Sequence, residues 1–114
     1  MFGGFAMRQL LATIIMTGLA GSAYADEVPV IHLILKDHVF SPQELTVPAG
    51  QKIKLLVKNE NATASEFESY ELNREKVVPA NSEITVFLDP LDPGTYPFFD
   101  DFNRDTTKGR IVVK

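Results

Sequence analysis

The feature that most constrains the fold is a series of short segments, from Val28 onward, in which apolar and polar residues alternate. This alternation is typical of β-strands that bury one face and expose the other. Turn residues such as those of Asp92-Pro93-Gly94 separate the segments, and no long helical period is present. The sequence therefore predicts an all-β sandwich or barrel. The apolar members of the alternating segments are Ile31, Leu33 and Leu35; Ile53, Leu55 and Val57; Ile84, Val86 and Leu88; and Ile111 and Val113.

The alternation weakens between Asn59 and Ser82, where most residues are polar. We expect a loop, a short strand around Phe67, and an irregular crossover with a helical turn near residues 71–76. A crossover of this kind is typical of a Greek-key sandwich.

The first 25 residues have the three parts of a secretory signal peptide. A cationic start (Arg8) precedes an apolar run over residues 10–19, and Ala23-Tyr24-Ala25 forms a cleavage signature. A membrane span needs about 20 apolar residues, so this run is short for an anchor. We expect a signal peptide over 1–25, one domain over 26–114, and contact with the membrane only during export.

The composition excludes several classes of function. The 114 residues include no cysteine, which rules out disulfides, thiol nucleophiles, Cys-based zinc sites and iron–sulfur clusters. Lys and Arg number 11 against 15 Asp and Glu, for a net charge of −4, and the basic residues form no patch along the sequence. Binding to nucleic acid needs clustered basic residues, so nucleic acid is not an expected partner.

The most specific segment reads GTYPFFDDF over residues 94–102 and is followed by GRIVV over 109–113. An earlier segment runs from Phe40-Ser41-Pro42 to Gly50, and Asn59 closes the next strand. Together these segments resemble the cupredoxins, in which a Gly-x-Tyr-x-Phe strand leads into the copper-ligand loop. The resemblance covers residues 30–114 and implies a cupredoxin-like Greek-key β-sandwich that follows the signal peptide.

The blue-copper ligands of that family are missing from this sequence. By resemblance, the first His position falls on Glu66, the Cys position on Asp100, the second His on Asn103, and the Met near Thr107. Without a thiolate or thioether, a blue copper centre is excluded. Because Tyr96, Phe98 and Asp100 share a strand face, we expect Asp100 to point toward the end of the sandwich interior.

Carboxylates stand at the former ligand positions. The arrangement would bring Glu66, Glu68, Asp100 and Asp101 to one end of the fold, and the family's loop order would place His38 there too. Crowded carboxylates raise one another's pKa values unless a cation compensates. Oxygen ligands with one imidazole suit iron or Mn(II), or Cu(II) in a non-blue geometry. We expect Glu66 and Asp100 as principal metal ligands and the other three as supplementary ligands or a second site. The alternative is that these acids are ordinary solvated side chains.

Residues 66–69, 72–79 and 98–102 are similar to a narrower group. They resemble the small periplasmic cupredoxin-like component of bacterial ferrous-iron uptake systems of the Ftr type. The resemblance implies a periplasmic protein that handles and oxidises Fe(II), with copper as a requirement. It also implies two partners, an inner-membrane iron permease and a second periplasmic iron-binding protein.

Three functions remain open from the sequence. The first is iron binding with ferroxidase-type oxidation, because anionic oxygen ligands favour Fe(III) over Fe(II). The second is a non-catalytic carrier that passes iron or copper to a partner. The third is a metal-free interaction module in which the ligand positions have decayed.

Overall fold

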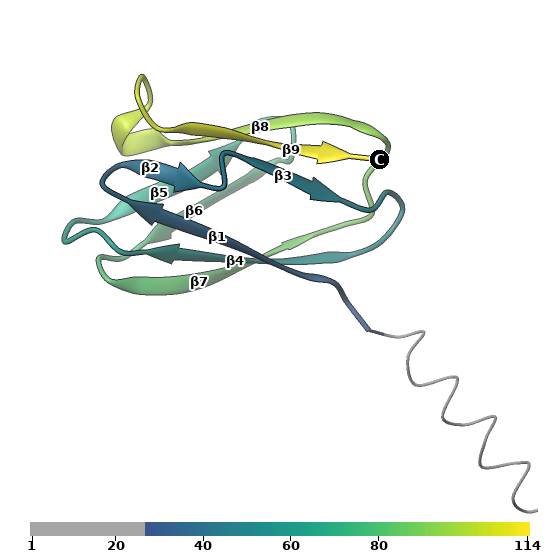
Figure 1. Ribbon diagram of the computed structural model, residues 1–114, viewed down its shortest axis with the longest axis horizontal. Helices are drawn as coiled ribbons and strands as arrows, with labels where there is room; N and C mark the ends of the chain where they lie inside the picture. Colours follow the sequence, from purple (N-terminus) through teal and green to yellow (C-terminus); the bar gives the residue numbers. More distant parts are fainter. Residues whose placement is uncertain (1–26) are drawn as a thin grey trace, which may run out of the picture.

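The computed structural model describes residues 27–114, which form nine strands and one short 3₁₀-helix (Figure 1). The predicted signal peptide, residues 1–25, lies outside the described residues. In the described part, no helix is long and apolar enough to cross a membrane. The elements are β1 (Val30–Lys36), β2 (Val39–Ser41), β3 (Glu44–Val47), β4 (Ile53–Asn59), β5 (Ser65–Ser69), β6 (Arg74–Val78), β7 (Ser82–Leu88), β8 (Gly94–Asp100), η1 (Asp101–Asn103) and β9 (Lys108–Val113).

The strands form two sheets that face one another (Figure 1). The four-stranded sheet has the order β2-β1-β4-β7, and the five-stranded sheet has the order β3-β9-β8-β5-β6. Strand β1 runs parallel to β4 and β3 runs parallel to β9, whereas the other pairs are antiparallel. The predicted all-β sandwich is therefore confirmed.

The core lies between the sheets and is built from the apolar members of the alternating segments. Leu33 and Val57, for example, are fully buried, while Ile34 on the opposite face of β1 is exposed. At one end of the core, the Phe98 ring lies 4.9 Å from the Phe40 ring and 5.3 Å from the Phe67 ring, measured between centroids. These three buried rings fill the interior beside the strands β5 and β8.

The stretch after Phe67 differs from the prediction. Instead of an irregular crossover with a helical turn, residues 65–78 form a β-hairpin, in which β5 pairs antiparallel with β6. Asn73 stands in the connecting turn with a φ of 54°, a conformation that asparagine tolerates better than most residues. The prediction of a helical turn was wrong because β6 is a largely exposed edge strand whose partner, β5, decides its conformation.

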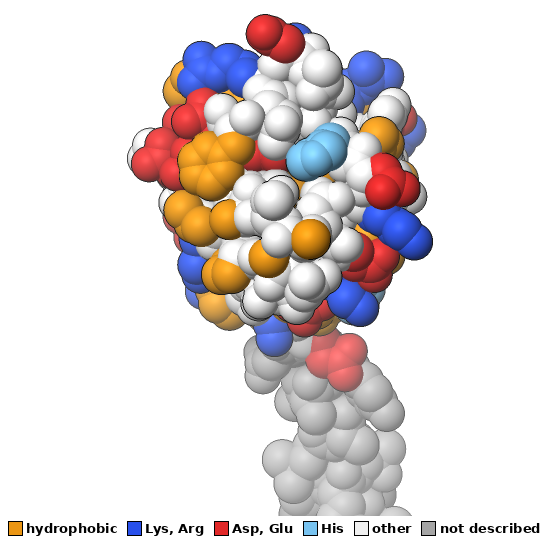
Figure 2. Space-filling model, turned by 90° about the vertical axis from the view of Figure 1, so that its left-hand side faces the viewer, with side chains coloured by type: hydrophobic (Ala, Val, Ile, Leu, Met, Phe, Trp, Pro, Cys, Tyr) orange, Lys and Arg blue, Asp and Glu red, His pale blue; other side chains and the backbone are white. Residues whose placement is uncertain are grey.

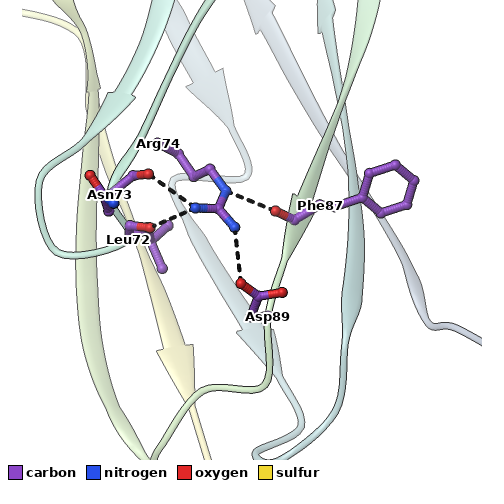
Figure 3. Close-up of polar contacts among 5 residues, drawn as sticks. All are labelled: Leu72, Asn73, Arg74, Phe87 and Asp89. Carbon is purple, nitrogen blue, oxygen red and sulfur yellow. Dashed lines mark hydrogen bonds and ion pairs between the residues drawn. The ribbon is translucent and has the colours of Figure 1, made fainter.

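Arg74 attaches this hairpin to the opposite sheet (Figure 3). Its Nε donates a hydrogen bond to the Phe87 carbonyl on β7 at 2.9 Å, and its Nη2 lies 3.4 Å from Asp89 Oδ2. Its Nη1 donates to the carbonyls of Asn73 and Leu72 at 3.0 and 3.4 Å. One guanidinium thus joins the β5–β6 turn to the edge of the four-stranded sheet.

Candidate metal centre

Two of the predicted ligands lie on the outer face of β5. Glu66 and Glu68 point away from the core, while Phe67 between them is buried in it, as the alternation along a strand requires. Glu68 is 9% exposed, which is low for a carboxylate. The expectation that the two glutamates share one face is confirmed.

A third carboxylate reaches the two glutamates from the end of β8. Asp100 ends β8 with its side chain buried, and Asp101 begins η1 with its side chain turned outward. One carboxylate oxygen from each of Glu66, Glu68 and Asp101 lies within 4.8 Å of the other two. We call these three residues the carboxylate cluster. The spacing would let one cation contact all three carboxylates.

Two further charged residues border the carboxylate cluster. Glu75 on β6 is the direct cross-strand partner of Glu68, so a fourth carboxylate adjoins the cluster. Arg104 forms an ion pair with Asp101 and places its guanidinium 5.0 Å from the centre of the Phe99 ring. Four carboxylates therefore lie together, and among the described residues the one ion pair made by the cluster is that between Asp101 and Arg104.

This imbalance changes the protonation of the cluster. Partial desolvation raises the pKa of Glu66, and a hydrogen bond to Asp101 and repulsion from neighbouring carboxylates raise it further. The pKa of Glu68 is raised by desolvation, and then by its hydrogen bond with Glu75 and by repulsion. The pKa of Asp101 is lowered, chiefly by its hydrogen bond from Arg104. Glu66 and Glu68 thus hold protons more readily than free glutamates do, and a bound cation would replace those protons.

Asp100 is not part of the cluster, although it is adjacent in sequence. Its buried Oδ1 accepts hydrogen bonds from the backbone N–H groups of Glu66 and Phe102, each at 3.0 Å. Its Oδ2 accepts one from the side-chain amide of Asn103 at 3.0 Å. The expectation that Asp100 points into the interior is confirmed. The carboxylate there fastens β5 and the start of η1 to the end of β8.

His38 also lies outside the group of residues that could share one cation. Asp37 and His38 have φ values of 52° and 58° and form the two-residue turn between β1 and β2, as expected for a type I′ hairpin. The His38 carbonyl accepts a hydrogen bond from the Thr107 hydroxyl at 2.6 Å. This conformation favours Asn, Asp or His on backbone grounds, so the turn accounts for a histidine here.

Figure 2 shows the end of the molecule that carries the turn between β1 and β2 and the segment between β8 and β9. Acidic side chains gather along one flank of this end, beside a patch of hydrophobic side chains.

Buried Asn59 holds the loop that leads into β5. Its amide donates to the carbonyls of Thr63 and Val78 at 2.9 and 3.1 Å, and its Oδ1 accepts from the Asn61 N–H at 2.9 Å. Asn59 thereby fixes where β5 begins.

Comparison with protein families decides the classification. Residues 9–113 match the family described as "Cupredoxin-like domain". The chain is a cupredoxin-like protein. The cupredoxin resemblance drawn from the sequence is therefore confirmed at the level of family and fold.

Individual proteins are similar to this chain in sequence or in fold. An uncharacterized protein of Rickettsia prowazekii (strain Madrid E) is 42% identical over 88 residues, which cover 77% of this chain and 70% of that protein. Among solved structures, the fold is similar to the metal-binding domain of the Streptococcus pneumoniae Cu(I)-exporting P-type ATPase CopA (TM-score 0.69, 13% identity, 78% of this chain and 88% of that one). It is also similar to auracyanin A, a "blue" copper protein from Chloroflexus aurantiacus (TM-score 0.66, 17% identity, 77% of this chain and 100% of that one). At these identities the two structures show the fold alone.

The cupredoxin-like protein does not present a blue-copper ligand set. The positions assigned to the Cys and second His ligands hold Asp100 and Asn103, which are hydrogen-bonded to each other, and Thr107 near the Met position bonds to a backbone carbonyl. The residue of β5 that faces the interior beside them is Ser65, whereas Glu66 faces outward. The Ser65 hydroxyl is buried and has no hydrogen-bond partner. No thiolate is available, so a blue copper ion does not fit this interior.

Sequence reasoning missed two residues of the centre. Glu75 lies in the stretch for which the sequence predicts a helical turn, and no pattern in the sequence marks Arg104. Recognising Glu75 required the β5–β6 register, which the polar sequence of residues 71–76 does not display. The fold and the acidic cluster together suggest a metal-binding domain, and the metal-ligand roles of the individual residues remain predictions.

Proposed function

We propose that this cupredoxin-like protein binds ferrous iron at Glu66 and Glu68 on the outer face of β5 and at Asp101 at the start of η1. The observation that carries the proposal is the approach of three carboxylate oxygens to within 4.8 Å of one another. Arg104 pairs with Asp101 and so neutralises part of the negative charge of the cluster. Oxygen-only ligands suit hard or borderline cations such as Fe²⁺, Fe³⁺ and Mn²⁺. Asp100 and His38 are left out of the proposed ligand set because their positions have other structural explanations.

The finer role that we propose is that of a periplasmic component of ferrous-iron uptake. It would take up Fe²⁺, support its oxidation, and deliver iron to an inner-membrane permease together with a second periplasmic iron-binding protein. Carboxylate ligands favour Fe³⁺, so oxidation would be easier in the cluster than in water. Each Fe²⁺ gives up one electron, and one O₂ takes up four electrons and four protons to form two water molecules. The support for this role is the sequence resemblance together with the oxygen-ligand chemistry of the cluster.

Copper enters this proposal as an assisting ion. The described residues offer it no thiolate, so it would be held as non-blue Cu²⁺ by carboxylates. The alternative function is a non-catalytic iron or copper carrier or interaction module. The position of the cluster on the outer face of the sheet, where its carboxylates are partly accessible, favours this alternative as much as it favours oxidation, because a carrier must release its metal to a partner.

Anaerobic titration of the purified protein with Fe²⁺ in a calorimeter tests the binding site. We expect saturable binding that is lost in the Glu66→Gln, Glu68→Gln double variant. Glu83→Gln is the matched control, because Glu83 is an exposed glutamate on β7 of the other sheet. Binding that survives in the double variant would refute the cluster as the site.

Oxygen uptake after addition of Fe²⁺, with and without one equivalent of copper, then separates the two functions. Uptake above the rate in buffer, lost in the double variant, supports oxidation. Saturable binding with uptake at the rate of buffer supports the carrier. The absence of any metal binding would leave the metal-free interaction module.

A further inference from the structure

A groove of about 620 Å³ lies on the outer face of the five-stranded sheet, beside the carboxylate cluster. It is lined by residues of β3, β8 and β9 and by the segments that follow β5 and η1. Small-molecule sites have volumes of roughly 300–1,000 Å³, so the groove has the size of a ligand site. None of its lining residues belongs to the carboxylate cluster.

The floor of the groove is mainly apolar, and its two aromatic rings are inclined to each other by 60°. The rings of Tyr70 and Phe99 lie 5.4 Å apart between centroids, and Pro97 continues the surface along β8. Tyr70 is 62% exposed, although a tyrosine ring is costly to leave in water. An aromatic ligand that packs against these side chains would remove that surface from water.

The rim of the groove is positively charged. Arg104, Lys108 and Arg110 line it, against a single acid, Glu44. Arg110 pairs with Glu44 at 2.7 Å, and Arg104 pairs with Asp101 outside the groove. Lys108 has no ion-pair partner among residues 27–114. In a protein of net charge −4, this local excess of positive charge favours an anion.

We propose that this groove binds a small organic anion with a planar apolar body, of which an aromatic carboxylate is the simplest example. The ligand ring packs between Tyr70 and Phe99, with its face on one ring and its edge toward the other, and the carboxylate pairs with the Lys108 ammonium. Stacking on the aromatic floor selects the planar body, and the unpaired lysine selects the negative charge. The site requires no metal in the carboxylate cluster, so it stands or falls independently of iron binding.

Titration of the metal-free protein with benzoate, followed by ¹H–¹⁵N correlation spectra, tests the proposal. We expect saturable shifts of the amide signals of Phe99, Lys108 and Gly109. Benzamide has the same ring without the charge and should bind more weakly. Lys108→Gln should weaken benzoate binding by roughly two- to fivefold, the effect of losing one exposed ion pair. Because Lys108 is exposed, this variant should keep the fold, which the dispersion of its spectrum verifies.

Lys36→Gln is the matched control, because Lys36 is an exposed lysine at the end of β1 in the other sheet. Benzoate affinity in this variant should equal that of the wild type. Equal responses to benzoate and benzamide would overturn the anionic ligand. Equal benzoate affinity in the wild type and in Lys108→Gln, or shifts confined to other surfaces, would overturn the groove as the site.

Discussion

Replacing Asp100 with alanine separates a structural carboxylate from a metal ligand. In the folded protein this side chain accepts three hydrogen bonds at 3.0 Å, two from backbone N–H groups and one from the Asn103 amide. A buried donor left without a partner costs about 1–3 kcal/mol, and losing a helix-capping side chain costs about 1 kcal/mol. These hydrogen bonds are partly buried, so water would replace some of the lost partners. We therefore expect Asp100→Ala to lower the free energy of unfolding by about 2–4 kcal/mol.

Urea unfolding followed by circular dichroism measures this loss. Asp100→Asn is the control, because its side-chain oxygen can still accept from the two backbone N–H groups and the Asn103 amide can turn to accept from the new amide. We expect that variant to lose about 1 kcal/mol or less. It should also bind Fe²⁺ as the wild type does.

Two results would refute this reasoning. The first is a free energy of unfolding of Asp100→Ala within about 0.5 kcal/mol of the wild-type value, which is the range of an ordinary surface substitution. The hydrogen bonds of Asp100 would then contribute little to stability. Loss of Fe²⁺ binding in Asp100→Asn at unchanged stability would make Asp100 a ligand after all.

Three other predictions follow from the cluster and the core. The raised pKa of Glu66 gives a stabilising contribution that is complete below the ordinary pKa of 4.5 and is lost as the pH rises through the raised value. The unfolding temperature of the metal-free protein should therefore fall less in Glu66→Gln than in the wild type between about pH 4 and pH 8, and equal falls would contradict this. Arg104→Gln removes the cation beside Asp101 and should tighten Fe²⁺ binding by roughly two- to tenfold in calorimetry. Weaker binding would show instead that Arg104 positions Asp101. Gly109→Ala would place a Cβ 2.5 Å from the Phe98 ring and should cost about 1–3 kcal/mol in urea unfolding, whereas an unchanged midpoint would mean that the ring moves freely.

The core was predictable because burial in a strand repeats every two residues. Leu33, Val57 and Ile111 could be assigned to the interior from their neighbours in sequence alone, and each is fully buried. The same rule distinguished Asp100 from Asp101: on a strand whose Phe98 is buried, the residue two positions later also faces inward.

The hairpin over residues 65–78 was less predictable because its second strand is an exposed edge. Arg74, Glu75, Lys76 and Val77 show no alternation, since the sheet continues on one side of β6 only and little of the strand is buried. The contacts that hold it come from β5 and from the Arg74 bonds to β7, which are distant in sequence. A sequence window over these residues contains none of those partners.

The sequence by itself determined the fold class, the faces of the strands, and the exclusion of blue copper, because these depend on local alternation and on which residue types are present. Only the tertiary structure decided which carboxylates meet. Glu66 and Glu68 come from β5, Asp101 from the start of η1, and Glu75 from β6. Their proximity depends on the pairing of β5 with both β6 and β8. The pairing of Lys108 on β9 with Phe99 on β8, which brings both residues to the groove, likewise depends on strand order, because neighbours across a sheet are set by long-range pairing.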